Sequence, residues 1–315
     1  MTPIRLLALS LLLLVATGCA ARAESREKNE PPVHTFEIRP GDASIKVTCS
    51  GNAASLDVAV LRDWIAESAA AVSVYFGRFP VQRLRIVVDA IEGRGAQSGT
   101  TYAYNGALIR VGVGRFTSHA DLQRDWIMAH EMVHLGFPQL AERYAWMEEG
   151  LATYVEPIAR AQAGQLSEEK VWGDMVEGLP QGLPAAGDRG LDNTHTWGRT
   201  YWGGALFFLL ADLRIREQTA NRFGLQDALR AILNRGGNNE AYWEVRRALD
   251  IGDAATGTKV LSELYDEMRA SPVSPDLGEM WRRLGVHMQA GRATFDESAP
   301  FAGIRRAITA KPFSG

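Results

Sequence analysis

The sequence contains little cysteine: two residues in 315, which excludes a disulfide-rich scaffold. It also lacks an excess of charge of one sign, because 34 Lys and Arg residues stand against 37 Asp and Glu residues, a net charge of −3. That balance gives no electrostatic reason to expect a nucleic-acid partner. A hydrophobic content of 46% with 13 prolines excludes disordered and collagen-like chains and leaves enough chain for a sizeable core.

Long hydrophobic runs are absent except near the N-terminus, where residues 6–15 are almost all apolar. This run is shorter than the roughly 20 residues that a membrane-spanning helix needs. Arg5 precedes it and small residues lead up to Cys19, which is the layout of a secretory signal. Residues 16–19 resemble a bacterial lipobox, which implies cleavage before Cys19 and acylation of that residue. We therefore expect a signal peptide over residues 1–18 and a lipid anchor at Cys19, with a secreted chain without lipid as the alternative.

The residues after Cys19 indicate where the anchor would hold the chain. Ala20 follows the cysteine, whereas in lipoprotein families an Asp there favours retention in the inner membrane. The resemblance therefore implies the cell envelope, at the outer membrane and facing the periplasm. Residues 19–33 are charged and end in Pro31-Pro32, which predicts a flexible tether. Membrane contact is expected through this anchor only, and nothing in the sequence indicates an oligomeric state.

The remaining chain, residues 34–315, is predicted to form one α+β domain. Alternating side chains predict a hairpin over 35–50, which buries Cys49, and strands at 84–88 and 107–111, with a helix at 57–77. The Gly-rich residues 92–106 are expected to connect the last two strands, and residues 164–196 to form a loop on the surface or at the border of a cleft. A strand-rich part (34–118) thus precedes a helical part (119–315), with helices expected at 119–136, 147–163, 203–217, 224–234, 239–248, 257–269 and 277–284.

His130-Glu131-Met132-Val133-His134 is the stretch that carries chemistry. On a helix, positions i and i+4 share a face, so both imidazoles can reach one metal ion. Glu131 can hold a metal-bound water without itself binding the ion. The helical context is present, because Ser118 and Asp121 form a predicted capping box ahead of a largely apolar segment. Two histidines that simply pack in a core helix are the alternative.

A second segment, Trp146-Met147-Glu148-Glu149-Gly150-Leu151-Ala152-Thr153-Tyr154, could supply a third ligand, because a zinc peptidase uses three protein ligands and an open position. Together the two segments resemble the gluzincin metallopeptidases of the peptidase MA-like clan, which share H-E-x-x-H with a downstream W-x-x-E-G-x-A-x-Y. The resemblance implies a zincin-like (thermolysin-like) fold with Glu149 as the third ligand. Glu148 is the neighbouring alternative. The 14-residue gap between His134 and Glu149 is closest to glycyl-aminopeptidase-like relatives.

A third segment, Thr200-Tyr201-Trp202-Gly203-Gly204-Ala205-Leu206, is similar to the Y-x-x-G-A-L helix start of the same relatives. That similarity implies that the Tyr201 hydroxyl stabilises an oxyanion; the alternative is an aromatic residue that only packs there. His195 could instead contribute a proton. Clan aminopeptidases bind the substrate amine with a Glu on the edge strand, but the corresponding segment here, residues 106–111, contains no acid. This departure weighs against aminopeptidase specificity.

The sequence therefore predicts a zinc metallopeptidase in which His130, His134 and Glu149 bind Zn²⁺. In this prediction Glu131 is the general base, Tyr201 stabilises the oxyanion, and the substrate is a peptide or protein. An edge strand near residues 107–113 would pair with the substrate backbone. Two alternatives remain open: a non-catalytic zinc-binding envelope lipoprotein on the same fold, and hydrolysis of a non-peptide bond by the same metal.

Overall fold

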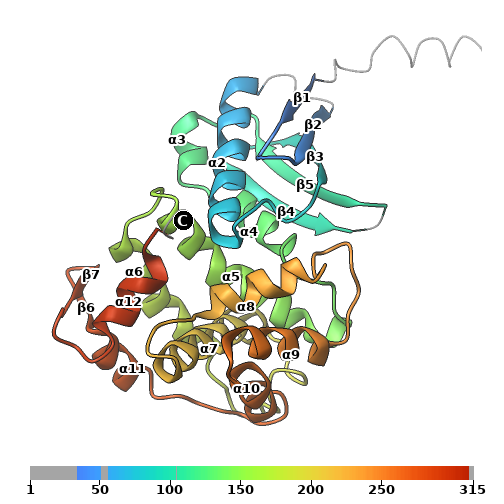
Figure 1. The fold of residues 1–315 in the computed structure, drawn as a ribbon. Coiled ribbons are helices and arrows are strands. Elements are labelled where there is room, and N and C mark those ends of the chain that lie inside the picture. The colour runs from blue at the N-terminus through green and yellow to red at the C-terminus, as the bar shows by residue number, and fades with distance from the viewer. Residues whose placement is uncertain (1–33, 51–55, 104, 312–315) are drawn as a thin grey trace, which may run out of the picture.

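The computed structural model describes residues 34–50, 56–103 and 105–311; the predicted signal peptide, Cys19 and the tether lie outside these residues. A mixed sheet with one covering helix forms one end of the molecule, and helices form the other (Figure 1). The predicted α+β organisation, a strand-containing first part followed by a helical remainder, is confirmed. Within the described residues, no helix has the length and apolar character needed to cross a bilayer.

The sheet has five strands in the order β1-β2-β3-β5-β4. β1 and β4 run antiparallel to their neighbours, whereas β2, β3 and β5 are parallel to one another. The predicted hairpin is confirmed as β1 and β2, and Cys49 is buried in β2. The strands are β1 (His34–Ile38), β2 (Ser44–Ser50), β3 (Arg83–Ile91), β4 (Ala96–Tyr102) and β5 (Ala107–Gly114).

The edge of this sheet differs from the prediction. β5 is paired on both sides, by β3 and by β4, so residues 107–113 are not an edge strand. The edge strand on this side of the sheet is β4, which lies inside the segment that was expected to be a connection; β1 is the other edge strand. β4 is rich in Gly, Thr, Ser and Gln and exposes most of its side chains, so it lacks the apolar alternation by which strands are recognised.

The helix α2 (Val58–Phe76) covers the sheet and is held at both ends by local signals. The Asp57 side chain accepts hydrogen bonds from the amides of Ala59 and Val60, and Gly77 ends the helix in the left-handed region, with φ of 79°. Its buried face, which includes Leu61, Trp64, Ile65, Val72 and Tyr75, packs between the sheet and the helical part. α2 therefore joins the two parts into one continuous core.

The expected helix at 119–136 is two helices, α3 (His119–Gln123) and α4 (Ile127–His134). The predicted capping box of Ser118 and Asp121 is present and begins α3. The break follows from Asp125, whose carboxylate accepts hydrogen bonds from the Trp64 indole and from the amide of Met128 in the first turn of α4. Asp125 thus starts a second helix in a new direction.

The helical part otherwise follows the prediction with three corrections. Residues 164–196 are not only a loop, because they contain α6 (Glu168–Gly178), capped by Ser167. The helix expected at 239–248 starts later, because residues 239–244 run beside Gln139 instead. A hairpin of β6 and β7 was not predicted. The elements are α5 (Ala145–Gln162), α7 (Gly204–Gln218), α8 (Leu225–Asn234), α9 (Val245–Thr256), α10 (Val260–Met268), α11 (Leu277–Leu284), β6 (Val286–Gln289), β7 (Arg292–Phe295) and α12 (Ala302–Thr309).

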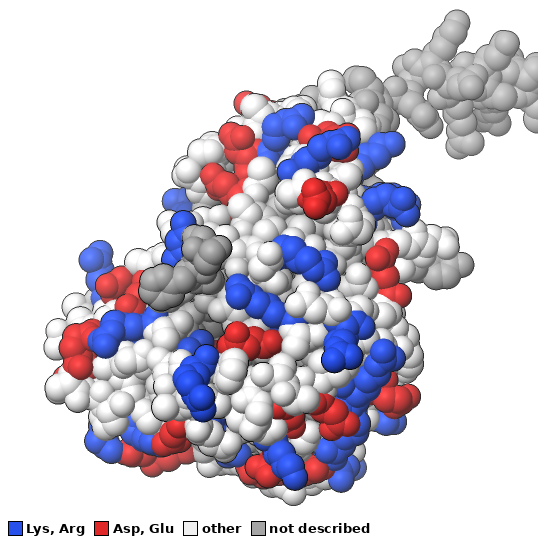
Figure 2. All heavy atoms as spheres, viewed as in Figure 1, with Lys and Arg blue, Asp and Glu red and all other residues white. Residues whose placement is uncertain are grey.

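Charged side chains of both signs are interspersed over the face shown in Figure 2. The surface also carries ion pairs, such as Arg214 with Glu267 and Arg282 with Glu279. This mixed surface agrees with the charge balance of the sequence. On this face the structure offers no broad basic field of the kind that binds nucleic acid.

Candidate active site

The helix α4 brings the two histidines of the H-E-x-x-H motif together. His130 and His134 lie one helical turn apart, with ring centroids 5.0 Å apart and ring planes nearly perpendicular. Both imidazoles are largely withdrawn from solvent, and Glu131 beside them is buried. The helix-face argument from the sequence therefore places both rings as expected.

The helix α5 packs against α4 and adds Glu149 to the two histidines. Its Oε2 lies 3.2 Å from His130 Nε2 and 3.6 Å from His134 Nε2. Ligand atoms of the three residues lie within 4.8 Å of one another. Donor atoms about 2.1 Å from a tetrahedral zinc ion are about 3.4 Å apart, and both distances from Glu149 are close to this value. Two imidazoles and a carboxylate are also a donor set that zinc accepts.

Glu148, the alternative third ligand, contacts the backbone of a nearby loop. Its Oε1 accepts a hydrogen bond of 2.9 Å from the amide of Leu140, on the loop that follows α4. Burial raises the pKa of Glu148. Of the two adjacent carboxylates, Glu149 is the one that joins the histidines, and Glu148 ties the loop to the start of α5.

The electrostatics of the cluster favour a negative Glu149. Burial by itself would raise the pKa of Glu149, but its contacts with His130 and His134 lower that pKa far below its usual range. Burial lowers the pKa of His130, whereas at His134 burial is outweighed by Glu149 and Glu131, which raise the pKa. A carboxylate and a neutral imidazole are the protonation states in which such side chains bind metal.

Two residues of the edge strand hold Glu131 in place, and the sequence analysis missed both. The Thr101 hydroxyl lies 2.7 Å from Glu131 Oε2 and donates a hydrogen bond to it. Gly99 faces the same side chain so closely that a Cβ atom there would lie 2.6 Å from Glu131 Cγ. A glycine is therefore required where β4 passes over α4. The only sequence signal was the Gly-Thr-Thr run itself, which carries no recognisable motif.

Tyr201 lies on the other side of the cluster, in a π-helical turn, η4 (Arg199–Gly203), that leads directly into α7. Such turns are uncommon and occur frequently at functional sites. The Tyr201 ring stacks at 6.3 Å on that of His130. Burial, together with the negative charge of Glu149, raises the pKa of the Tyr201 hydroxyl to about 12. The hydroxyl is therefore a proton donor over the whole physiological pH range.

The cleft over the cluster has a volume of about 660 Å³, within the range of small-ligand sites. One wall is the edge strand β4, and the opposite side is formed by α4, α5 and Tyr201. Asn239 and Gln139 lie at the end where β4 stops, and the buried side-chain oxygen of Asn239 has no hydrogen-bond partner among the described residues. His195 is exposed on the loop before η4 and is not among the described residues that line this cleft.

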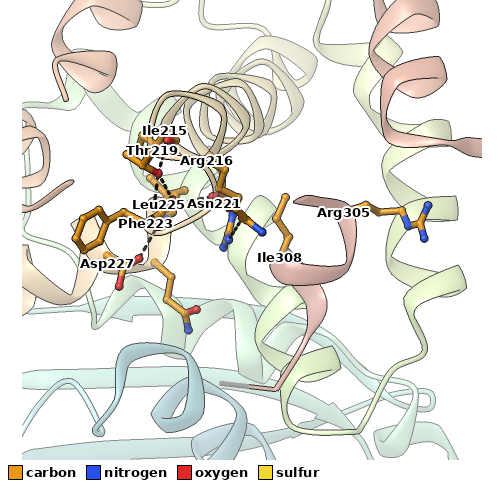
Figure 3. A network of polar contacts seen from close by, with 12 residues as sticks. Ile215, Arg216, Thr219, Asn221, Phe223, Leu225, Asp227, Arg305 and Ile308 are labelled. Atoms are coloured by element: carbon orange, nitrogen blue, oxygen red, sulfur yellow. Dashed lines mark hydrogen bonds and ion pairs between the residues drawn. The ribbon is translucent and has the colours of Figure 1, made fainter. Parts of the chain in front are cut away.

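A buried polar network connects α5 to α7. The Tyr154 hydroxyl donates to Asp212 of α7, and Arg216 pairs with the same carboxylate at 2.8 Å. Arg216 also donates to Asn221, in the turn between α7 and α8 (Figure 3). These are bonds to charged groups inside the core, so they fix the helix that carries Glu149 relative to α7.

The C-terminal helix, α12, is held by polar contacts to α5 and α6. Gln162, the last residue of α5, donates a hydrogen bond of 2.9 Å to the carbonyl of Ile308 in α12. Arg305 of α12, fully buried, donates to the carbonyl of Leu284 and pairs with Glu168 at the start of α6. The position of α12 beside α5 and α6 is visible in Figure 1.

Comparisons with known proteins identify the fold. No protein-family model and no curated protein matches this chain. An aminopeptidase N family protein from Idiomarina loihiensis has a similar structure, with a TM-score of 0.60 at 16% identity over 82% of this chain and 50% of its own. A two-domain M1 zinc metallopeptidase variant bound to L-arginine gives 0.52 at 15% identity, over 78% of this chain and 53% of its own. The M1 zinc metallopeptidase from Deinococcus radiodurans gives 0.50 at 14% identity, with the same coverage.

The chain therefore shares its fold with the M1 zinc metallopeptidases and spans about half of the length of these solved chains. The gluzincin fold implied by the two sequence motifs is confirmed as a similarity of fold to these M1 zinc metallopeptidases. The His-His-Glu cluster lies where two helices of this fold meet.

Proposed function

We propose that this protein is a zinc-dependent peptidase. The observation that carries the proposal is the convergence of His130, His134 and Glu149 from two separate helices at one end of a cleft. Glu131 and Tyr201, which line the same cleft, have the chemistry that peptide hydrolysis needs next to a metal. When bound, the zinc ion would act as a Lewis acid and lower the pKa of the attacking water.

Glu131 and Tyr201 carry out the remaining steps, proton transfer and stabilisation of the oxyanion. Glu131, with one carboxylate oxygen held by Thr101, accepts the proton of the attacking water and passes it to the leaving amine. The Tyr201 hydroxyl, kept protonated by its raised pKa, donates a hydrogen bond to the carbonyl oxygen as negative charge develops there. The buried position of the cluster strengthens both interactions, because bulk water screens them less.

The edge strand β4 supplies a means of holding a peptide. Among the described strands, β4 pairs only with β5, so its other edge can add an extended chain as a further strand. Its residues 97–102 line the cleft that contains Glu131 and the metal cluster. A peptide paired with β4 would pass beside the cluster, as hydrolysis of its backbone requires.

We also propose that the chain is a lipoprotein, anchored through Cys19 at the outer membrane and facing the periplasm. The support for this comes from residues 1–33 of the sequence, which precede the described fold. Metabolic labelling with a fatty acid tests it: the full chain should take up label, and Cys19→Ser should not. Equal label in both would contradict acylation at Cys19.

The proposed activity is tested by metal analysis and cleavage on the same protein. The chain from residue 34 onward, purified beside Glu149→Ala, should contain about one zinc ion, which the variant loses. A quenched-fluorescence peptide mixture should be cut by the wild type, and a chelator should stop the cleavage. The matched control is Glu148→Gln, which should keep its zinc because Glu148 bonds to Leu140 instead. Zinc without cleavage of any peptide would contradict the peptidase and favour a zinc-binding scaffold.

A further inference from the structure

A second cavity, of about 800 Å³, adjoins the metal cleft. Residues just before α4, one face of α5, the helix α6 and the π-helical turn η4 enclose it. Trp126, His130 and Tyr201 line both this cavity and the metal cleft, so the two are separated only by these side chains. A group bound in the second cavity would thus lie next to the reacting bond of a peptide in the first.

Three tryptophans form the walls of this second cavity. Trp126 and Trp197 are 52% and 61% exposed, and both line this cavity. Large exposed apolar side chains that gather in one place mark a binding site. Trp197 stacks on Tyr201 at 5.7 Å, and Trp126 meets His130 edge-on at 5.3 Å. The two indoles therefore continue a row of aromatic rings that runs through the metal site.

The third tryptophan, Trp202, is locked in place by its neighbours. Its ring lies against Gly178 at the end of α6, where any side chain would overlap the indole. Leu166 and Pro157 add apolar surface to the same walls. The aromatic walls are thus held in place partly by packing of α6, an element that the sequence did not predict.

Two ion pairs line the cavity; of its other charged groups, Arg124 pairs with Asp121 and Glu177 is exposed. Glu156 and Arg160, both buried on α5, form an ion pair of 2.9 Å. Lys170 and Asp174 form another at the rim, at 2.6 Å. A charged ligand side chain that reaches the buried α5 wall would have to break the Glu156–Arg160 pair or remain unpaired beside it, which is costly. A neutral apolar side chain meets no such cost.

We infer that this cavity, named here the tryptophan pocket, is a specificity subsite that binds a large neutral side chain, aromatic by preference, of the residue next to the scissile bond. The inference rests on the proposed peptidase function. Aromatic side chains fit because indole walls offer them stacked and edge-to-face contacts beyond simple area burial. The volume of the pocket is far greater than an alanine or glycine side chain would fill.

Binding and cleavage test the inference separately. The probes are N-acetyl-phenylalaninamide and N-acetyl-alaninamide, titrated against the wild type and followed by tryptophan fluorescence and calorimetry. The phenylalanine probe should bind at least tenfold more tightly, and Trp197→Ala should remove most of that difference while Trp197→Phe keeps it. Phe116→Ala is the matched control, because Phe116 is 63% exposed but does not line the pocket.

Cleavage of a peptide library should show the same preference. The wild type should cut peptides with Phe or Tyr next to the scissile bond about 10- to 100-fold faster, in kcat/KM, than those with Ala. Trp197→Ala should reduce this ratio about tenfold, and Phe116→Ala should leave it unchanged. Equal binding of the two probes, or a ratio that Trp197→Ala leaves intact, would overturn the inference even if peptides are cut. Selective binding that Trp197→Ala abolishes, with no cleavage of any peptide, would support the pocket and contradict the peptidase.

Discussion

Gly150 of α5 and Gly204 of α7 lie in direct backbone contact, and a Cβ atom on either residue would overlap the main chain of the other helix. Gly150 immediately follows Glu149 of the His-His-Glu cluster, and Gly204 immediately follows the turn that carries Tyr201. The contact between the two glycines therefore sets the separation of Glu149 and Tyr201. The glycine of the E-G pair is required by this crossing of two helices.

A side chain at this crossing should disturb both stability and activity. We expect Gly150→Ala to destabilise the fold by about 1–3 kcal/mol, because the two helices must move apart, and to lower kcat by displacing Tyr201. Gly173→Ala is the control, because a Cβ atom at Gly173 of α6 meets nothing closer than 3.9 Å. Urea denaturation and peptide cleavage provide the measurements. If the two variants behave alike, the crossing does not control the site.

Substitutions of Glu131 and of Thr101, which holds it, should show whether catalysis can be lost while metal binding remains. Glu131→Gln should retain its zinc, since Glu131 is outside the ligand cluster, and lose about 10²- to 10⁴-fold in kcat. Thr101→Val, which removes the hydrogen bond to Glu131, should cost about 10- to 100-fold, and Thr101→Ser should restore most of it. Zinc analysis and kcat are measured on the same samples. Full activity in Glu131→Gln would refute its role as the base.

Removal of the Tyr201 hydroxyl should lower kcat and leave substrate binding largely intact. We expect Tyr201→Phe to lower kcat by about 10²- to 10³-fold with little change in KM, because the hydrogen bond forms as charge develops on the oxyanion. Since the pKa of Tyr201 is raised to about 12, its ionisation should not reduce activity between pH 7 and 10. An alkaline decline in this range that disappears in Tyr201→Phe would contradict the assignment.

The buried Glu156 should make stability depend on pH. Burial raises the pKa of Glu156 from 4.5 to about 7, despite Arg160 beside it and with Asp125 and Asp174 adding to the rise. The folded chain therefore holds this proton more tightly than the unfolded chain does. The contribution of Glu156 is fully present below about pH 4.5 and is lost as the pH rises towards 7.

Glu156→Gln removes this titration and should flatten the stability profile between pH 4.5 and 7 by about 1–3 kcal/mol. Glu267→Gln is the control, because Glu267 lies in an exposed pair with Arg214 and is not among the groups that shift the pKa of Glu156, so its replacement should leave the slope in place. Urea midpoints at several pH values provide the measurement. A slope that is unchanged in Glu156→Gln would show that its proton affinity is ordinary.

The convergence of His130, His134 and Glu149 could be predicted from the sequence because these residues occur at fixed spacings. His130 and His134 share a face through the helical repeat, and Glu149 precedes a glycine that the family motif requires. Glu131 follows from the same pattern. The fold class was also accessible, since the hairpin, two of the strands and most helices have periodic side chains that the structure confirms.

The rest depends on contacts between residues that are distant in the chain. Thr101 and Gly99 lie on a polar strand without apolar alternation, so neither β4 nor its contact with Glu131 could be seen in advance. Trp126 and Trp197 are 71 positions apart in the chain and share one cavity only because α4 and η4 meet at the metal site. α6 has a clear capping serine, but one glycine inside it (Gly173) and one at its end (Gly178) make the segment resemble a loop.

The unpaired edge of β4 has a consequence for which substrates can enter. Strand addition needs a segment that is extended and has free backbone groups along its length. A helix or a strand already inside a sheet has used those groups, so a folded protein offers β4 nothing to pair with. Under the proposed function the cleft would therefore select by conformation first and by side chain second. Tails, linkers and unfolded chains would be cut, while compact domains carrying the same residues would be spared.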